Sequence, residues 1–523
     1  MDTLLSNIEE RRGELQEGLD SSKTRSERNV LGQFSTPFSF AKAILEESKK
    51  YFDKIRTVSF LDPAFGTGVF YSTLIQTFPK EDVSKASGIE VDLRYAEPIK
   101  EIWQRFPLEI RIADFMSLAP PDAQSEKYNL IVCNPPYTRH HHIPKAQKQS
   151  LQQWVKNNFG YRISGLSGLY CYFMLCSDKW LSDKGLACWL IPSEFMDVNY
   201  GKTLKRYLTE KVTLLRIHRF HPEDVQFDDA LVTSVVVWFT KARTTEEGQV
   251  IFSYGTSLAS PEGQRSVELV KMEPSEKWSN YFSNKEKLEK CTLTLGDYFH
   301  IKRGVATGDN KFFILSEGER KERNIPLQFL YPILPSPRYL KEDIIESHTN
   351  GLPDIEKPLF LLDCDLDEEE IKQKYPHLWT YLSQGIGSVS ERYICRHRTP
   401  WYRQEKRSPA AFLCTYMGRN RNSRRKPFRF ILNKSKAVAA NVYLLLYPKP
   451  LLARVIANDS AIRESVLDVL NSIDIELLVR AGRVYGGGLH KLEPKELENL
   501  PLAGFGDIAP ELRIRKIVQG SLF

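Results

Sequence analysis

The chain has 523 residues, enough for two to four domains with a sizeable core. Hydrophobic residues make up 41% of it and charged residues 27%, which is typical of a folded globular protein and excludes a disordered or collagen-like chain. The net charge of 73 − 66 = +7 permits a nucleic-acid partner without requiring one. The eight cysteines occur singly with no CxxC pair, which indicates a reducing compartment and neither a disulfide framework nor a zinc site.

The first 30 residues predict an amphipathic helix followed by a polar connector. Their charge is too high for a secretory signal peptide, and no apolar run in the chain is long enough to span a bilayer. We therefore expect a cytoplasmic protein without a membrane partner. The segment 32–37, GQFSTP, is a turn that leads into the next helical pattern.

Residues 58–70 predict a hydrophobic strand, a glycine turn and the start of a helix, which is the opening unit of a doubly wound sheet. Neither of the usual pyrophosphate-binding patterns, GxGxxG or GxxxxGK, is present. Instead, Asp62 lies at the strand end, where a carboxylate suits a cationic amino group. This arrangement favours S-adenosylmethionine over NAD or ATP.

Acidic residues also end the next two predicted strands. Glu90 follows Gly68 by 22 residues, at the end of the second strand, where its carboxylate can accept from both ribose hydroxyls. Asp114 ends the third strand and is placed to accept from an adenine amino group, with Phe115 beside that ring. A helix cap is the alternative role for each acid taken alone.

A fourth apolar strand, 128–133, ends in Asn134-Pro135-Pro136-Tyr137. The prolines stiffen the turn and remove N–H donors, so the Asn134 side-chain oxygen and the Pro135 carbonyl form a pair of acceptors. An exocyclic amine on a planar ring has two N–H donors that such a pair can hold. Tyr137 offers a face on which the ring can stack.

The ordered set GQFSTP, DPAFGTG, GIEVD, ADF and NPPY resembles the gamma-class, TaqI-like N6-adenine DNA methyltransferases of bacterial type II restriction–modification systems. The resemblance covers residues 32–240. It implies an α/β fold: a Rossmann-like S-adenosylmethionine-dependent methyltransferase domain with a doubly wound, mostly parallel sheet, followed by a C-terminal α+β target-recognition domain. The expected domains are 1–30 (helix and connector), 31–245 (catalytic), 246–290 (linker) and 291–523 (target recognition).

The resemblance also assigns roles to individual residues. Those that hold the cofactor S-adenosylmethionine are Phe34, Thr36, Pro37, Asp62, Pro63, Ala64, Gly66, Gly68, Glu90, Asp114, Phe115, Leu169, Tyr170 and Phe173. For the last three, plain core packing is the alternative. The catalytic residues are Asn134, Pro135, Pro136 and Tyr137, and Tyr137 and Phe227 are expected to stack on the two faces of the target base.

No metal site is predicted, because the three consecutive histidines at 140–142 do not share a helix face and have no spaced acidic or cysteine partner. Two basic stretches, 392–407 and 419–429, interleave arginines with aromatic residues. Phosphate neutralisation and guanine reading are preferred there over a merely solvated face. The predicted DNA-binding residues are Arg396, Arg398, Arg403, Arg419, Arg421, Arg424, Arg425 and Lys426.

The expected activity is methyl transfer from S-adenosylmethionine to N6 of adenine in a specific double-stranded DNA sequence, with the base flipped out of the helix. We expect a monomer that works beside a cognate restriction endonuclease. N4-cytosine methylation is the alternative within the class, since the amine chemistry is the same. RNA guanine or protein glutamine methylation fits the long C-terminal half less well. A non-catalytic DNA-binding specificity protein on a methylase fold is the alternative from another class.

Overall fold

The computed structural model describes residues 3–52, 57–221, 233–241, 248–282, 293–419, 427–459, 461–485, 488–502 and 504–513. It divides into two compact units. Unit 1 comprises residues 1–285 with 485–487, and unit 2 comprises residues 286–484 with 488–523. Among the described residues, no helix is long and apolar enough to cross a membrane.

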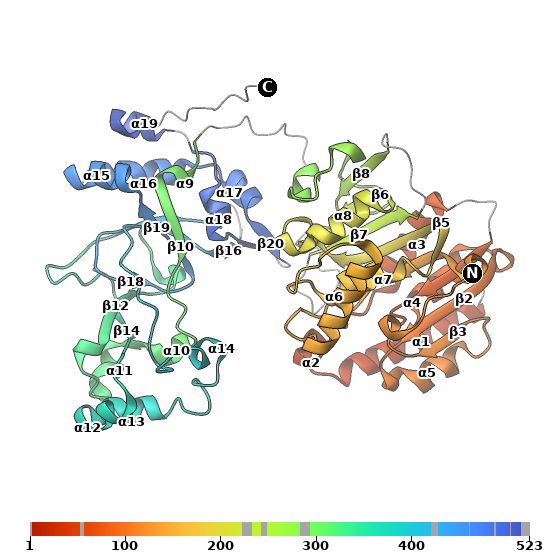
Figure 1. Cartoon of the computed structure of the whole chain (residues 1–523), viewed down its shortest axis with the longest axis horizontal. Helices are drawn as coiled ribbons and strands as arrows, with labels where there is room; N and C mark the ends of the chain where they lie inside the picture. The colour runs from red at the N-terminus through yellow and green to blue at the C-terminus, as the bar shows by residue number, and fades with distance from the viewer. Residues whose placement is uncertain are drawn as a thin grey trace. The chain divides into compact units, whose positions relative to one another are not determined.

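Unit 1 is an α/β unit in which strands and helices alternate over most of its length (Figure 1). Its helices are α1 (Thr3–Ser21), α2 (Arg25–Leu31), α3 (Phe38–Tyr51), α4 (Val69–Thr77), α5 (Leu93–Trp103), α6 (Lys145–Phe159), α7 (Leu169–Ser177) and α8 (Lys202–Glu210). Its strands are β1 (Val58–Asp62), β2 (Val83–Glu90), β3 (Glu109–Ile112), β4 (Tyr128–Cys133), β5 (Leu181–Pro192), β6 (Thr213–Arg219), β7 (Ser234–Thr240), β8 (Gln249–Tyr254) and β9 (Gly263–Glu268).

The strands of unit 1 form one sheet in the order β3-β2-β1-β4-β5-β7-β6-β8-β9. The pairs β1–β2, β2–β3, β1–β4, β4–β5 and β6–β8 are parallel. β7 runs antiparallel between β5 and β6, and β9 is antiparallel to β8. The predicted Rossmann-like, mostly parallel sheet is thus confirmed.

Alternate residues of each strand point to opposite sides of the sheet, and helices cover both of these sides. Trp189 of β5 packs in the cluster that contains residues of α6, α7 and α8. Trp238 of β7 packs in the other cluster, with residues of α1, α3, α4 and α5. Both indole side chains are fully buried. This double covering explains why the strands are nearly continuous hydrophobic runs in the sequence.

The structure corrects the prediction that residues 246–290 are a linker. Residues 249–254 and 263–268 form β8 and β9, which extend the sheet of the catalytic unit. The polar composition that suggested a linker has a structural cause. β9 is an edge strand with β8 as its neighbour in the sheet, and most of its residues are exposed or half-exposed.

Unit 2 is an α+β unit built around short sheets. Its helices are α9 (Leu295–Tyr298), α10 (Asn310–Phe313), α11 (Glu317–Glu322), α12 (Glu368–Lys374), α13 (Pro376–Ser383), α14 (Tyr393–Arg396), α15 (Pro450–Asn458), α16 (Ile462–Ser472), α17 (Ile475–Ala481), α18 (Pro494–Glu498) and α19 (Phe505–Ile508). Its strands are β10 (Phe299–Arg303), β11 (Ile314–Ser316), β12 (Leu330–Leu334), β13 (Ile344–Ile345), β14 (Leu359–Leu362), β15 (Phe412–Thr415), β16 (Met417–Arg419), β17 (Phe430–Asn433), β18 (Val438–Ala439), β19 (Tyr443–Pro448), β20 (Arg483–Tyr485) and β21 (Leu489–Lys491).

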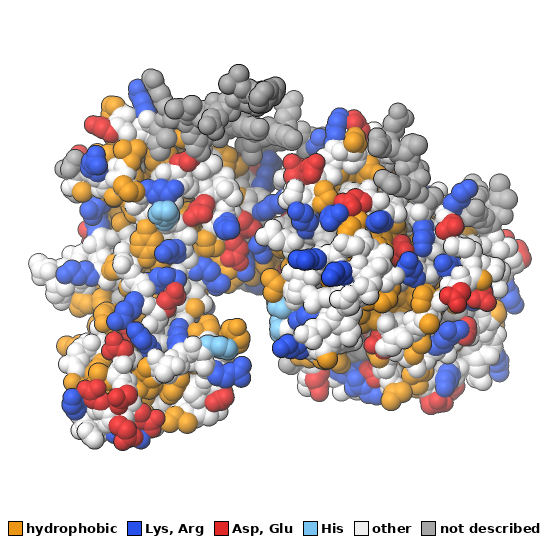
Figure 2. Space-filling model, viewed as in Figure 1, with side chains coloured by type: hydrophobic (Ala, Val, Ile, Leu, Met, Phe, Trp, Pro, Cys, Tyr) orange, Lys and Arg blue, Asp and Glu red, His pale blue; other side chains and the backbone are white. Residues whose placement is uncertain are grey.

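The strands of unit 2 form three sheets, with the orders β10-β19-β15-β17-β13, β11-β14-β12-β18 and β16-β21-β20. On the face drawn in Figure 2, acidic side chains gather over α12, whose first turn carries Glu368, Glu369 and Glu370. Carboxylates in the first turn interact favourably with the positive end of the helix dipole.

With its short sheets and interspersed helices, the described part of this unit is consistent with the predicted α+β class.

Candidate active site

The candidate active site lies at the carboxyl ends of β1 to β4, at the point where the strand order reverses between β1 and β4. A cavity of about 230 Å³ is present there. Its lining comprises Gln16, Asp20, Gly32, Gln33, Phe34, Ser35, Pro63, Ala64, Gly66, Ile89, Glu90, Val91, Tyr95, Ala113, Asp114, Phe115, Met116, Asn134, Pro135, Pro136, Gln147, Leu169 and Phe173. The structure thus brings together, in one cavity, residues from every motif that the sequence singled out up to Phe173.

Asp62, the last residue of β1, is a buried carboxylate next to this cavity. Its Oδ1 accepts a hydrogen bond from the backbone N–H of Ala64 at 3.1 Å. Its Oδ2 is buried and has no hydrogen-bond partner among the described residues. Burial, together with the charge of Glu90, raises the pKa of the Asp62 carboxyl to about 8. A cationic ligand at Oδ2 would remove this penalty.

Glu90 ends β2 and is held by two backbone amides. Its Oε2 accepts from Gly66 N and its Oε1 from Asp92 N, both at 2.8 Å. Burial raises the pKa of this carboxyl too, although the two amides oppose that shift. Val91 follows it and is 63% exposed, which is unusual for a large aliphatic side chain that lines a cavity. Glu90 and Val91 therefore offer two acceptor oxygens and an apolar surface side by side.

Asp114 and Phe115 follow β3. Asp114 caps a short 3₁₀ turn: its Oδ1 accepts from Met116 N at 3.0 Å and its Oδ2 from the hydroxyl of Ser117 at 3.2 Å. Phe115 is buried, with its ring centroid 5.5 Å from that of Phe173. Asp114 therefore performs the capping role and also lines the cavity.

The amide of Asn134 has a defined orientation. Its Nδ2 donates to the backbone oxygen of Phe34 at 2.9 Å and to Oγ1 of Thr36 at 3.0 Å. Both amide hydrogens are therefore used, and the orientation of the side chain is fixed. The Asn134 Oδ1 is buried and has no hydrogen-bond partner among the described residues. A buried acceptor without a partner is costly, and a ligand with an N–H donor would satisfy it.

The turn after Asn134 is also tied to the segment GQFSTP. Tyr137 N donates to the Gly32 oxygen at 2.8 Å, and the hydroxyl of Thr138 donates to the Leu31 oxygen at 2.7 Å. Gly32 has φ +68°, and a Cβ at this position would lie 2.2 Å from Thr138 N. Only glycine allows the two backbones to approach this closely. The segment that resembles a cofactor motif thus also positions the NPPY turn.

Tyr137 is 7% exposed and is not among the residues that line the cavity. Its hydroxyl donates to the Leu190 oxygen at 3.1 Å, and its ring lies 5.6 Å from that of Phe34. The other predicted stacking residue, Phe227, lies outside the described residues. The stacking roles of both residues stay predictions.

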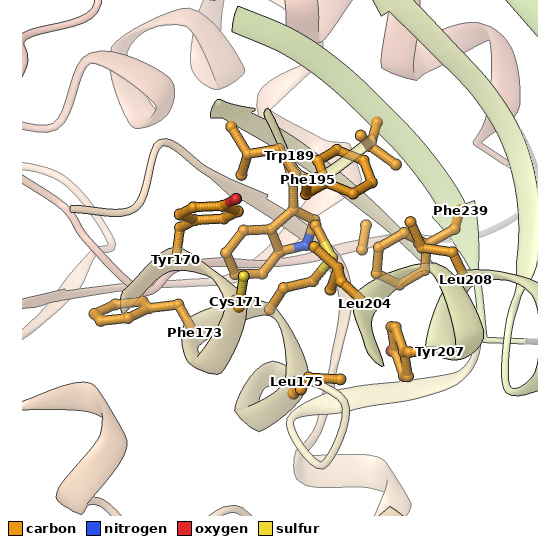
Figure 3. Packing of buried hydrophobic residues seen from close by; sticks show 14 of the residues in the cluster. Tyr170, Cys171, Phe173, Leu175, Trp189, Phe195, Leu204, Tyr207, Leu208 and Phe239 are labelled. Carbon is orange, nitrogen blue, oxygen red and sulfur yellow. The ribbon is translucent and has the colours of Figure 1, made fainter. Parts of the chain in front are cut away.

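Five residues predicted to hold the cofactor are not among those that line the cavity, and Asp62, described above, is one of them. Thr36 is buried against Asn134, Pro37 precedes α3 and is exposed, and Gly68 precedes α4 with φ +88°. Tyr170 lies beside Trp189 within a hydrophobic cluster, whereas Phe173 lies at the edge of that cluster (Figure 3). The core-packing alternative therefore describes Tyr170, while Leu169 and Phe173 line the cavity.

Several lining residues were not predicted from the sequence. Val91 and Tyr95 follow the acidic residue of β2, and Val91 could have been identified from its place directly after Glu90. Gln16 and Asp20 come from α1, which the sequence had separated from the catalytic domain. The polar residues along that helix do not distinguish, in the sequence, a packed face from a solvated one.

Comparisons with known proteins find similarity to DNA methyltransferases in both halves of the chain. Residues 73–226 match the model of the Eco57I restriction-modification methylases, and residues 275–519 match that of the C-terminal domain of the type II methyltransferase M.Eco57I. Among curated proteins, the chain is 28% identical to the type II methyltransferase M.AccI of Acinetobacter calcoaceticus, over 91% of this chain and 86% of that protein. It is 26% identical to M.XamI of Xanthomonas campestris pv. amaranthicola, over 84% and 79% respectively. Over most of its length, the chain is therefore similar to type II restriction–modification DNA methyltransferases.

A solved structure of the type IIL restriction-modification enzyme MmeI in complex with DNA has the same fold as this methyltransferase. The two share a TM-score of 0.53 at 14% identity, over 82% of this chain and 64% of that one. The chain therefore spans just under two thirds of that neighbour's length.

In unit 2 of the methyltransferase, the predicted DNA-binding arginines differ in their surroundings. Arg396, Arg403 and Arg419 are exposed. Arg398 is half-buried and donates to the backbone oxygens of Ala306 and Thr307 at 2.6 and 3.0 Å. Arg421, Arg424, Arg425 and Lys426 lie outside the described residues. The Arg398 guanidinium is thus already engaged in holding a loop of its own unit.

Proposed function

We propose that this methyltransferase transfers a methyl group from S-adenosylmethionine to N6 of adenine in a specific double-stranded DNA sequence. The observation that carries the proposal is the orientation of Asn134, whose two amide hydrogens are used by Phe34 and Thr36 and whose oxygen is buried without a partner among the described residues. That oxygen, beside the carbonyl of Pro135, suits the two hydrogens of an exocyclic amine.

The residues of the chain act mainly by positioning and by fixed dipoles. When the Asn134 oxygen and the Pro135 carbonyl accept the two amine hydrogens, the nitrogen lone pair is drawn out of conjugation with the ring and becomes available for attack. Bound S-adenosylmethionine supplies the methyl group as an electrophilic sulfonium. Transfer is a direct displacement, so no covalent intermediate on the protein is required. The NPPY turn must hold its geometry throughout, and Gly32, Phe34 and Thr36 hold it.

The cavity also fits the cofactor. Asp62 offers an unpartnered buried oxygen to the cationic amino group, and Glu90 offers two oxygens to the ribose hydroxyls. Val91 and Phe173 supply apolar surface for the adenine ring, with Asp114 beside them. An ammonium near Asp62 would favour its charged form and lower the pKa that burial has raised.

Duplex DNA is the proposed substrate, with the target base rotated out of the stack so that it can reach Asn134. For Tyr137 to stack on that base, its ring must become more exposed than the present 7%. The exposed Arg396, Arg403 and Arg419 of unit 2 are proposed to contact phosphates or bases. In this role the protein would protect DNA from a cognate restriction endonuclease.

N4-cytosine is the second candidate target, because the same pair of acceptors can hold a cytosine amine. The resemblance favours adenine, since related cytosine enzymes more often carry serine at the position of Asn134. A non-catalytic specificity protein is disfavoured, because Glu90, Asp114 and the oriented Asn134 line the cavity and the buried Asp62 is retained at the end of β1.

The test is to incubate the purified protein with unmodified plasmid DNA and isotopically labelled S-adenosylmethionine, and then to identify the labelled nucleoside by mass spectrometry. Label on N6-methyladenine is the expected result, and label on N4-methylcytosine would transfer the proposal to the second candidate. Asn134→Ala should lower kcat at least 1,000-fold while the Kd for S-adenosylhomocysteine changes less than about threefold, since it removes an acceptor for the reacting amine. Turnover that survives this change would refute the role of the NPPY turn.

A further inference from the structure

Helix α1 (Thr3–Ser21) carries a stripe of polar side chains in which Arg12, Gln16 and Asp20 are spaced four residues apart. Residues with this spacing lie on one face of a helix. Arg12 is only 4% exposed, although arginine is rarely buried this deeply without specific partners. The partners of this stripe therefore indicate what α1 is packed against.

The stripe is bonded to the glycine turn that leads from β1 into α4. The Arg12 Nη1 donates to the hydroxyl oxygen of Thr67 at 2.8 Å, and that hydroxyl donates to the Gln16 Oε1 at 2.8 Å. The remaining donors of Arg12 engage Glu9, whose Oε2 also accepts from the hydroxyl of Ser72 at 2.5 Å. Three side chains of α1 thus hold the helix to the turn that borders the cavity and to the start of α4.

Further along the helix, the stripe reaches the cavity itself. Gln16 and Asp20 both line it. Asp20 also accepts from the hydroxyl of Ser35 at 2.8 Å. Just after the helix, the buried Lys23 forms an ion pair with Asp92 at 3.0 Å. The first 23 residues therefore bridge the start of α4, the GQFSTP segment and the end of β2.

We propose that α1 is a clamp over the methyl donor, in which Gln16 and Asp20 contact the cofactor and Arg12 positions the helix by holding Thr67. This inference rests on the proposed use of S-adenosylmethionine. Gln16 offers a donor and an acceptor to polar groups of the ligand, and Asp20 adds a negative charge to a cavity that receives a cationic molecule. Neither residue belongs to a motif that the sequence had singled out.

The clamp has a thermodynamic consequence. A ligand that contacts both α1 and the glycine turn stabilises the packing of α1 by the free energy of its contacts with the helix. Because this coupling is reciprocal, a variant in which α1 is less firmly held must bind the ligand more weakly. Cofactor affinity and the protection of α1 from hydrogen exchange should therefore rise and fall together.

The test uses the full-length protein and the probe S-adenosylhomocysteine. The variants are Asp20→Asn, Arg12→Ala and the conservative Arg12→Lys. The control is Arg11→Ala, because Arg11 is on the same helix but exposed, and its pair with Glu101 is on the surface. Titration calorimetry gives the Kd, and steady-state kinetics give the KM for S-adenosylmethionine and kcat.

We expect Arg12→Ala to raise Kd and KM about tenfold or more and Asp20→Asn about fivefold, with kcat at saturating cofactor within twofold of wild type. Arg12→Lys should recover part of the loss, because one donor can still reach Thr67, and Arg11→Ala should match wild type. In wild type, S-adenosylhomocysteine should slow amide exchange in residues 8–21, and this protection should shrink in parallel with affinity.

Arg12→Ala also removes the ion-pair partner of Glu9, so a loss of affinity in this variant can come from unfolding of the helix. Asp20→Asn controls for this, because asparagine has the same shape as aspartate. Hydrogen exchange of α1 in the ligand-free Asp20→Asn variant is compared with that of wild type. Unchanged Kd values in both variants, or ligand protection that omits α1, would overturn the clamp while leaving the proposed function intact. Failure of wild type to bind the probe would instead refute the proposed cofactor, and the clamp with it.

Discussion

Replacing Asp62 by asparagine should stabilise the cofactor-free protein at neutral pH and, at the same time, weaken binding of S-adenosylmethionine. The reason is that Asp62 is 1% exposed, with one carboxylate oxygen bonded to Ala64 N and the other without a partner among the described residues. Burial raises the pKa of this carboxyl from 3.8 to about 8, and the nearby Glu90 adds to the shift.

The sign and size of the effect follow from the two pKa values. A carboxyl whose pKa is raised on folding contributes most favourably to stability below its unfolded pKa, and this stability is lost as the pH rises towards the folded pKa, because the unfolded state ionises first. The loss is roughly 1.4 kcal/mol per pH unit, on the order of 4 kcal/mol at pH 7 and under about 2 kcal/mol at pH 5. Asparagine avoids it but buries amide donors at a cost of about 1–3 kcal/mol.

The difference in free energy of unfolding, Asp62→Asn minus wild type, should therefore be near zero or negative at pH 5 and about +1–3 kcal/mol at pH 7. For a unit of this size, the change between the two pH values corresponds to a shift in Tm of roughly 5–10 °C. Scanning calorimetry without cofactor from pH 5 to 8 measures this shift in Tm. The transition to follow is the one whose Tm is raised by S-adenosylhomocysteine in wild type. Asp122→Asn, at an exposed position, is the control and should show no such trend. A difference between Asp62→Asn and wild type that does not grow with pH would refute the reasoning.

Three further changes test other parts of the structure. Gly32→Ala should lower kcat about 100-fold, with a much smaller effect on cofactor Kd, because its Cβ would lie 2.2 Å from Thr138 N and displace the segment that holds the NPPY turn; steady-state kinetics check this, and normal kcat would contradict it. Arg216→Ala should lower the free energy of unfolding by about 3–5 kcal/mol in a denaturant titration, because it breaks the buried ion pair with Glu47 at 2.6 Å and leaves that carboxylate with Lys50 as its remaining ion-pair partner; a loss below about 1 kcal/mol would contradict this. Arg419→Ala should reduce by about one the slope of log Kd against log salt for DNA binding, and an unchanged slope would exclude a phosphate contact.

The sequence predicted the part of the site that depends on local chain chemistry. A parallel strand that ends in an acid or in Asn-Pro-Pro places that group at the carboxyl edge of the sheet, wherever the helices pack. Asp62, Glu90, Asp114 and Asn134 are accordingly found together at or beside one cavity. The mostly parallel sheet covered on both faces also followed, because strands buried on both sides must be nearly continuous hydrophobic runs.

What the sequence did not reveal depends on contacts between distant segments. The residues of α1 at 12, 16 and 20 are polar, and from the sequence such a stripe is indistinguishable from a solvated face; their partners Thr67 and Ser35 are 15 to 55 residues away. The edge strand β9 has a polar sequence for the opposite reason, since most of its side chains are exposed and need not be apolar. In both cases, polar composition alone does not determine where a segment is packed.

Tyr170 and Phe173 illustrate the same limit within a single helix. Both are aromatic, both lie near the start of α7 and both are almost fully buried. Three residues correspond to about 300° of rotation around the helix axis, so the two side chains point in different directions. Tyr170 lies beside Trp189 (Figure 3), whereas Phe173 lines the cavity. Only the rotation of the helix against the sheet decides which of them can contact a ligand.

The central claim is tested most directly by modification-sensitive single-molecule sequencing of DNA from cells that express the protein, compared with cells that express Asn134→Ala. The account predicts N6-methyladenine at one defined sequence motif in the first sample and none at that motif in the second. N4-methylcytosine at a motif, or no modification while the purified protein still binds DNA, would contradict it.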